Sequence, residues 1–163
     1  MKKAHYIFYS LIISIFTLLS CSTSKQARTY DKTVDGSWIL KTVSSEGIKG
    51  KVKVDLFNEA DFQCFVGSTW TFDTRRSLGT YSIMNDGECV GIKRNFRWTI
   101  YEATSSDPKL LQFKRLTDNL KDMDNGDGFR LTIVQLDSKT MQLRSEISFE
   151  NKPAAFVYNF VKN

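Results

Sequence analysis

Thr140-Met-Gln-Leu-Arg-Ser-Glu-Ile-Ser-Phe149 is the stretch that decides the fold, because the character of its side chains alternates from one residue to the next. Met141, Leu143 and Ile147 share one parity, and the residues of the other parity are all polar. Successive side chains of a β-strand point to opposite faces. The pattern therefore predicts a strand with one buried face and one solvated face.

The same period of two returns along the chain from residue 36 onward. Phe96, Trp98 and Ile100, for example, alternate with Arg97 and Thr99. The segments with this pattern give eight predicted strands, at residues 37–43, 68–73, 78–84, 95–102, 110–115, 128–136, 140–149 and 154–162.

Turn residues separate these segments at the spacing of about 8–12 residues that is typical of β-sandwiches and barrels. Ser, Asp and Pro gather, for example, at 105–108. Each strand can pair with its neighbour, and closing such a meander removes its exposed edges. The sequence therefore predicts an all-β fold, an eight-stranded antiparallel up-and-down β-barrel. Residues 44–67 are less clear, since Val52, Val54 and Phe57 fit either a short strand or one helical turn.

The apolar parity of each predicted strand gives the inward face of the barrel. A barrel of eight strands has room either for its own side chains or for one small ligand. The predicted inward residues are Trp38, Leu40, Trp70, Phe72, Tyr81, Ile83, Phe96, Trp98, Ile100, Leu111, Phe113, Phe129, Leu131, Ile133, Met141, Leu143, Ile147, Phe149, Phe156, Tyr158 and Phe160.

Cys64 and Cys89 form an even pair that can bridge in an oxidising compartment. Paired residue numbers in an antiparallel hairpin have a constant sum. A register with 64 opposite 89 therefore also places Trp70 opposite Ile83, so that large apolar residues share one face. We predict a Cys64–Cys89 disulfide, and two free thiols are the alternative.

The N-terminus has the features of a secretory signal: Lys2 and Lys3 precede an apolar run at residues 6–19. This run is shorter than the roughly 20 residues that a transmembrane helix needs. Leu18-Leu-Ser-Cys21 follows and resembles the lipobox of bacterial lipoproteins, in which the cysteine is acylated. An ordinary signal peptide with an accidental cysteine is the alternative.

These features predict three parts of the chain. Residues 1–20 are a cleaved lipoprotein signal peptide, residues 21–34 a polar and flexible lipidated tether, and residues 35–163 the barrel domain. Acyl chains on Cys21 would hold the protein at a membrane. Ser22 after the cysteine resembles known sorting signals and favours the outer membrane of a bacterial cell envelope, facing the periplasm.

Composition argues against catalysis, metal binding and nucleic-acid binding. The single histidine is His5, inside the predicted signal peptide, so the mature chain has no imidazole for a catalytic triad or a histidine zinc site. Loss of Lys2 and Lys3 leaves 21 basic and 18 acidic residues, a formal charge of +3, which is too small to indicate nucleic acid. We expect no enzyme activity, no cofactor and no metal.

The acidic segment at 118–128 resembles a calcium loop only at first sight. In an EF-hand loop that starts at Asp122, the sixth residue is Asp127 where glycine is required, and the twelfth is Ile133 where glutamate is required. A solvated connection between two strands is the favoured interpretation.

Asp35-Gly-Ser-Trp38 resembles the glycine-x-tryptophan motif of lipocalins. With the segments at 57–61, 67–72, 79–81, 128–131 and 152–162, residues 35–163 resemble the small lipocalin-like lipoproteins of Gram-negative bacteria. The resemblance implies a calycin-type barrel and a small apolar ligand inside it. The residues that it implies for ligand binding are Trp38, Trp70, Phe72, Tyr81, Phe96, Trp98, Phe113, Phe129, Leu131, Leu143, Phe156 and Tyr158.

Two functions from different classes remain open. The first is a lipid-anchored lipocalin-like carrier of a small apolar molecule. The second is a non-enzymatic interaction module, which docks on an envelope partner or inhibits a periplasmic enzyme through its loops.

Replacing Cys21 by serine should prevent lipidation and move the protein out of the membrane fraction, because the acyl chains carry the anchoring free energy. Fractionation of cells followed by a carbonate wash measures this. A Cys21→Ser protein that stays with the washed membranes contradicts the lipobox interpretation.

Overall fold

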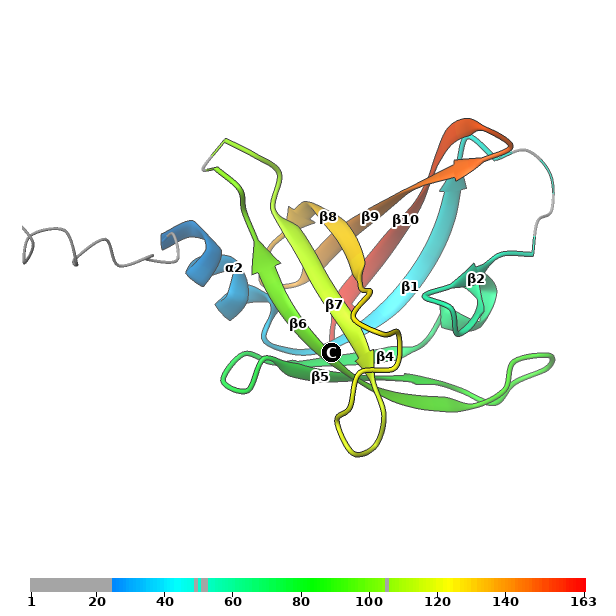
Figure 1. Ribbon diagram of the computed structural model, residues 1–163, viewed down its shortest axis with the longest axis horizontal. Coiled ribbons are helices and arrows are strands. Elements are labelled where there is room, and N and C mark those ends of the chain that lie inside the picture. The colour runs from blue at the N-terminus through cyan, green and yellow to red at the C-terminus, as the bar shows by residue number, and fades with distance from the viewer. Residues whose placement is uncertain (1–24, 49, 51–52, 105) are drawn as a thin grey trace, which may run out of the picture.

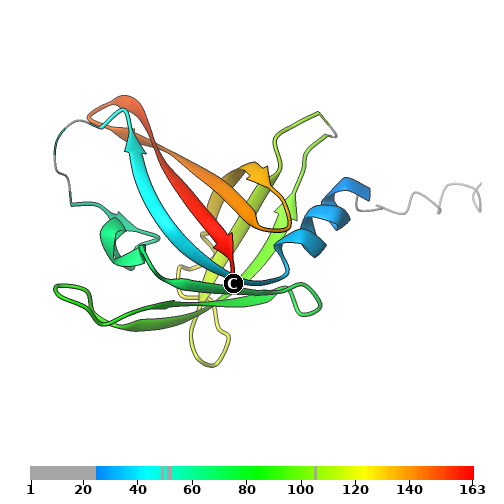
Figure 2. The same ribbon diagram turned by 180° about the vertical axis from the view of Figure 1, so that it is seen from behind.

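A computed structural model describes residues 25–48, 50, 53–104 and 106–163 (Figure 1). The predicted signal peptide and Cys21 lie outside the described residues. Eight antiparallel strands close into one barrel, in which β1 pairs with both β4 and β10 (Figures 1 and 2). The barrel strands are β1 (Gly36–Glu46), β4 (Thr69–Asp73), β5 (Leu78–Ile83), β6 (Ile92–Tyr101), β7 (Leu110–Leu116), β8 (Phe129–Leu136), β9 (Thr140–Phe149) and β10 (Lys152–Lys162).

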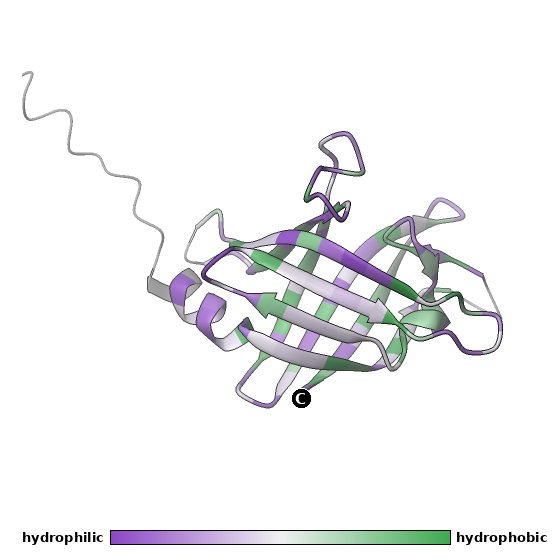
Figure 3. Ribbon diagram, turned by 90° about the horizontal axis from the view of Figure 1, so that it is seen from below, coloured by the Kyte–Doolittle hydropathy of each residue, from purple (hydrophilic) through white to green (hydrophobic). Residues whose placement is uncertain are grey.

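The predicted all-β up-and-down barrel is confirmed, and each of the eight predicted strands overlaps one barrel strand. Hydrophobic and hydrophilic residues alternate along the strands, as the colours of Figure 3 show. The last strand closes the barrel: β10 pairs with β1 from Trp38, opposite Lys162, to Glu46, opposite Ala155.

The connections define two ends of the barrel. The β4–β5, β6–β7 and β8–β9 connections lie at one end, which we call the helix end because α2 (Lys25–Val34) packs there. The other end holds a two-stranded sheet formed by β2 (Asp55–Leu56) and β3 (Ala60–Asp61), followed by the 3₁₀-helix η2 (Phe62–Phe65). We call residues 55–61 the plug hairpin and this end the hairpin end. Figure 1 shows α2 and β2 on opposite sides of the barrel.

Helix α2 corrects the prediction of a flexible tether for the described part of residues 21–34. Val34 is fully buried, and its carbonyl oxygen accepts a 2.7 Å hydrogen bond from Trp38 Nε1. Thr74 Oγ1, in the β4–β5 connection, donates to Asp31 O at 3.1 Å. Tyr30 and Val34 are four residues apart, so they share one helix face and pack on the barrel despite the polar composition around them.

No helix among the described residues is long and apolar enough to cross a membrane.

Aromatic rings fill the barrel around Trp70. Its ring centroid lies 4.7 Å from that of Tyr81, 5.5 Å from Phe96 and 5.8 Å from Phe113. Of the predicted inward residues, Phe129 and Ile147 are only partly buried, Phe149 is half-buried, and the other inward residues are buried. The inward parity of every strand was therefore predicted correctly, and burial decreases where β8 and β9 reach the hairpin end.

The predicted disulfide is present, with 5.4 Å between the Cα atoms of Cys64 and Cys89. The register inferred from it is wrong by two residues, since Trp70 pairs with Tyr81 and not with Ile83. Cys64 lies in η2 and Cys89 in the β5–β6 connection, so neither cysteine belongs to the strand ladder that the inference assumed. A shift of two keeps every side chain on its face, which is why the inward set survives the error.

Replacing both Cys64 and Cys89 by alanine should lower the free energy of unfolding by about 3 kcal/mol, because the bond closes a loop of 25 residues and its loss frees the unfolded chain. Urea denaturation measures the change. Met84→Ser in the same connection, where the side chain is 71% exposed, is the control and should change the free energy by less than about 0.5 kcal/mol. Equal stability of the double variant and the parent contradicts this role.

Candidate functional site

Strands β8 and β9 separate at the hairpin end of the barrel. They pair from Thr132, opposite Arg144, to Leu136, opposite Met141. Beyond Thr132, the first residues of β8 pair only with β7, and beyond Arg144 the end of β9 pairs only with β10. The plug hairpin lies beside this opening.

A cleft of about 400 Å³ runs between the plug hairpin and the separated strands. We call it the hairpin cleft. Its lining residues are Val54, Asp55, Leu56, Phe57, Asn58, Gly128, Phe129, Arg130, Leu131, Ser145, Glu146, Ile147, Phe156 and Tyr158.

One neutral polar pair is set among the apolar side chains of the hairpin cleft. Ser145 Oγ and Tyr158 OH lie 2.9 Å apart and share a hydrogen bond. Burial raises the pKa of Tyr158 well above its usual value, and the hydrogen bond with Ser145 opposes this only in part. The phenol therefore stays protonated near neutral pH and offers a neutral hydrogen-bonding group.

Phe57 closes the inner side of the hairpin cleft with an unusual backbone. Its φ is +54° and that of Asn58 is +51°, and Glu59 N donates to Leu56 O at 3.0 Å across the turn. Two successive positive φ angles are typical of a type I′ turn, where Asn and Gly are common. A bulky residue at such a φ is an outlier that costs about 1–3 kcal/mol, so its surroundings must stabilise it.

Those surroundings are aromatic. The ring of Phe57 stacks on Tyr158 at 5.7 Å with an interplanar angle of 25°. Phe113 and Phe129 meet it edge-on at 5.1 Å and 5.3 Å, as do Phe65 and Trp70 at 5.4 Å and 5.9 Å. Edge-to-face and offset pairs are the favourable arrangements of aromatic rings. Phe57 therefore fills the barrel interior at the hairpin end.

A buried ion-pair network holds the next residues of the plug hairpin. Glu59 Oε2 accepts from Tyr81 OH at 2.6 Å and from Arg94 Nε at 3.0 Å, and Glu59 Oε1 accepts from Arg94 Nη2 at 2.8 Å. Arg115 Nη1 donates to Glu59 Oε2 at 3.2 Å. Arg115 Nε also donates to Asp124 Oδ2 at 2.9 Å. We call these five side chains the Glu59 network.

The charges of this network stabilise one another. Burial acts to raise the pKa of Glu59, but the hydrogen bonds from Arg94, Tyr81 and Arg115 outweigh it, so this pKa lies below its usual value. The hydrogen bond to Asp124, and then that to Glu59, raises the pKa of Arg115 further despite burial. Glu59 therefore carries its negative charge at neutral pH and fixes the plug hairpin to β6 and β7.

The structure divides the predicted ligand-binding residues into two groups. Phe129, Leu131, Phe156 and Tyr158 line the hairpin cleft. The remaining ones lie deeper in the packed core and are Trp38, Trp70, Phe72, Tyr81, Phe96, Trp98, Phe113 and Leu143.

The sequence analysis missed the part of the site that the plug hairpin supplies. Leu56 and Phe57 belong to no strand of the barrel, and so they carry no alternation to detect. Ser145 was overlooked as a site residue because a polar side chain on an inward face looks like a break in the pattern. The only signal was local: two apolar residues directly before Asn58, which is a residue that favours turns.

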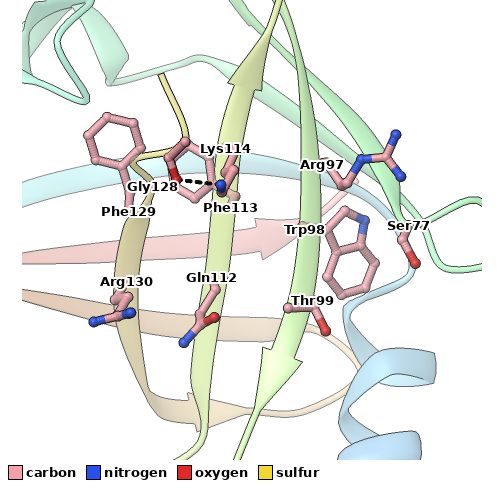
Figure 4. A pocket seen from close by; sticks show the side chains of 11 residues that line it. Ser77, Arg97, Trp98, Thr99, Gln112, Phe113, Lys114, Gly128, Phe129 and Arg130 are labelled. Carbon is pink, nitrogen blue, oxygen red and sulfur yellow. Dashed lines mark hydrogen bonds between the residues drawn. The ribbon is translucent and has the colours of Figure 1, made fainter. Parts of the chain in front are cut away.

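A larger hollow, of about 580 Å³, lies on the outer side of β6, β7 and β8 and is lined by Arg97, Lys114 and Arg130 (Figure 4). Lys114 Nζ donates to Gly126 O. The guanidinium groups of Arg97 and Arg130 point away from each other in Figure 4, so they do not converge on a common ligand position. Among the described residues, no group of three or more His, Cys, Asp or Glu side chains could hold a metal ion. The hairpin cleft, which reaches the ring of Phe57 in the aromatic interior, is the candidate site.

No protein-family model and no curated protein matches the sequence. Among solved structures, the odorant-binding protein from bovine nasal mucosa is 12% identical with a TM-score of 0.38, over 88% of this chain and 77% of that chain. A complex of bovine odorant-binding protein with a selenium-containing odorant is 12% identical with a TM-score of 0.39, over 87% and 78%. A deswapped triple mutant of the bovine protein is 13% identical with a TM-score of 0.37, over 80% and 74%. The barrel assignment rests on the strand pairing of this chain itself.

Phe57→Ala should lower the free energy of unfolding by about 3–5 kcal/mol, as loss of a buried aromatic ring does. Phe57→Gly should be at least as stable as Phe57→Ala, because alanine in the left-handed region costs roughly 1–2 kcal/mol that glycine avoids. Urea denaturation of both variants measures this order.

Phe65, buried in η2 without a positive φ, is the matched control. There the usual order should hold, with glycine less stable than alanine by about 0.5–1 kcal/mol. The same order at both positions contradicts the strained turn.

Proposed function

We propose that this chain is a lipid-anchored envelope protein whose barrel binds one small apolar molecule in the hairpin cleft. The observation that carries the proposal is the cleft itself, a hollow lined largely by apolar side chains that opens between β8 and β9 onto the aromatic interior at Phe57. Sites for small molecules are concave and mostly apolar, with a few polar groups that fix orientation. Leu131, Ile147 and Phe156 supply the apolar wall, and the pair of Ser145 and Tyr158 supplies the polar groups.

The chemistry of the hairpin cleft favours binding over catalysis. The hydroxyl group of Ser145 resembles a catalytic nucleophile. Its hydrogen-bond partner, however, is the phenol of Tyr158, and burial raises the pKa of that phenol. A protonated phenol cannot take the serine proton as a general base does. A ligand in the cleft would meet rings, aliphatic groups and the neutral pair of Ser145 and Tyr158, and the charged residues Asp55, Arg130 and Glu146 also belong to the lining.

Lipidation at Cys21 and a place in the bacterial envelope are the second part of the proposal, and the sequence at residues 2–21 supports them. The position of α2 agrees with this arrangement. It lies at the helix end of the barrel, opposite the plug hairpin (Figure 1), so an anchor that precedes α2 leaves the hairpin cleft accessible.

Docking of an envelope protein is a second candidate function. Large apolar side chains are exposed in three connections at the hairpin end. They are Val66, Met84, Val90, Leu120 and Met123. This candidate predicts that substitutions in these loops change partner binding and leave small-molecule binding unaltered.

Titration with a neutral naphthalene probe tests ligand binding. We expect a saturable change in tryptophan fluorescence at one molecule per chain, since Trp70 lies 5.9 Å from Phe57. Ile147→Glu should weaken binding by about tenfold or more, because the ligand would have to desolvate a carboxylate at the cleft.

Val134→Glu is the matched control, because it places the same charge on the neighbouring strand β8, at a side chain that is 53% exposed and outside the hairpin cleft. It should leave the affinity unchanged. The proposed site is wrong if the two glutamate variants bind alike, and the carrier function is wrong if no saturable signal appears below about millimolar concentration.

A further inference from the structure

We propose that the plug hairpin is an internal competitor of the ligand: a molecule with a planar aromatic ring takes the place of Phe57, and the Glu59 network sets the affinity by holding the hairpin in. This rests on the proposed function, because it describes how the same site is regulated and which ligand class it accepts. Four features of the described residues carry it.

The first feature is the shape of the space that Phe57 occupies. One ring, Tyr158, is stacked on it, and Phe65, Trp70, Phe113 and Phe129 present edges or faces at steep angles. This arrangement suits a flat aromatic ring, which gains from edge-to-face contacts that a saturated ring of similar size cannot make. The side chain of Phe57 is thus itself a planar aromatic ring, like the proposed ligands, but one that is covalently attached to the chain.

The second feature is that the plug hairpin is independent of the barrel ladder. Strands β2 and β3 form a sheet of their own, and the backbone bonds from Glu59 to Leu56 and from Phe62 to Val54 stay within the segment. The described contacts to the barrel include the packing of Leu56, the Phe57 ring and Ala60 on the core, the Glu59 carboxylate, and Asn58 O, which accepts from Arg115 Nη1 at 2.8 Å. Outward movement of the hairpin therefore breaks side-chain contacts and leaves the barrel closed.

The third feature is that the chain is tied directly after the hairpin. Cys64 lies in η2, three residues beyond β3, and its disulfide with Cys89 fixes η2 to the β5–β6 connection. Movement of the hairpin is thus confined to residues before η2.

The fourth feature is that the barrel side of the Glu59 network tolerates the loss of Glu59. Arg115 keeps its two bonds to Asp124 when the hairpin leaves. The side chain of Arg94 is 20% exposed and can take water in place of the carboxylate. Opening therefore leaves no buried charge without compensation. An uncompensated buried charge is what makes the breaking of a buried ion pair so unfavourable.

Binding of the same naphthalene probe to network variants tests the inference. When the competent state is a minor population, the apparent Kd is the intrinsic Kd divided by that population. Glu59→Gln keeps the size of the side chain and removes its charge, so it should raise the open population and tighten probe binding by about tenfold. Naphthalene should also bind this variant more tightly than its saturated analogue decalin.

Glu88→Gln is the matched control, since it removes the same charge from an exposed position at the hairpin end and should leave the affinity unchanged. Circular dichroism shows whether each variant folds. If Glu59→Gln does not fold, Arg94→Gln, which removes the partly exposed partner, should give the same tightening.

The outcomes separate the inference from the function on which it rests. Tighter aromatic binding to Glu59→Gln or Arg94→Gln, with Glu88→Gln unchanged, supports the inference. Equal or weaker binding to the network variants, with the parent still binding, overturns the internal competitor and leaves the binding function standing. No saturable binding to any of the proteins overturns the binding function itself.

Discussion

The position of Phe57 inside the barrel is the contact on which the hairpin end depends. A barrel of eight strands encloses a space that must hold side chains or a guest, and protein interiors leave few empty voids. Strands β8 and β9 separate at this end, and the ring of Phe57 packs there against Phe129 of β8. The ring of Phe57 in the plug hairpin completes the core, despite a backbone φ angle that phenylalanine rarely adopts.

The Glu59 network explains the position of the plug hairpin relative to the barrel. Buried ion pairs contribute little net stability, because removing charges from water costs nearly what their attraction returns, but they penalise any arrangement that leaves one member unpaired. Arg94 and Arg115 point into the barrel from β6 and β7, and Glu59 pairs with both of them there. The network therefore selects one placement of the hairpin, while the rings supply most of the favourable packing.

The sequence predicted the parts of the molecule that repeat. Strands, inward faces and the Cys64–Cys89 bond followed from a period of two and from pairing of cysteines, and even the error in register moved no side chain to the wrong face. Helix α2 was missed because only Tyr30 and Val34 make it amphipathic, too few for a pattern. Phe57 was missed for a related reason: a turn between two-residue strands has no period, and its place is decided by long-range contacts with Trp70, Phe113 and Tyr158.

The pairing of β1 with β10 also constrains how the chain folds. Trp38 and its partner Lys162, whose ammonium lies 4.3 Å from the centre of the indole ring, come from the two ends of the domain. Contacts between residues so far apart in the chain form late and slowly. Until the final strand is available, β1 and β9 both keep an unpaired edge, and such edges invite aggregation. The growing chain is therefore an open sheet that needs protection until β10 has emerged, and only then can it close into a barrel.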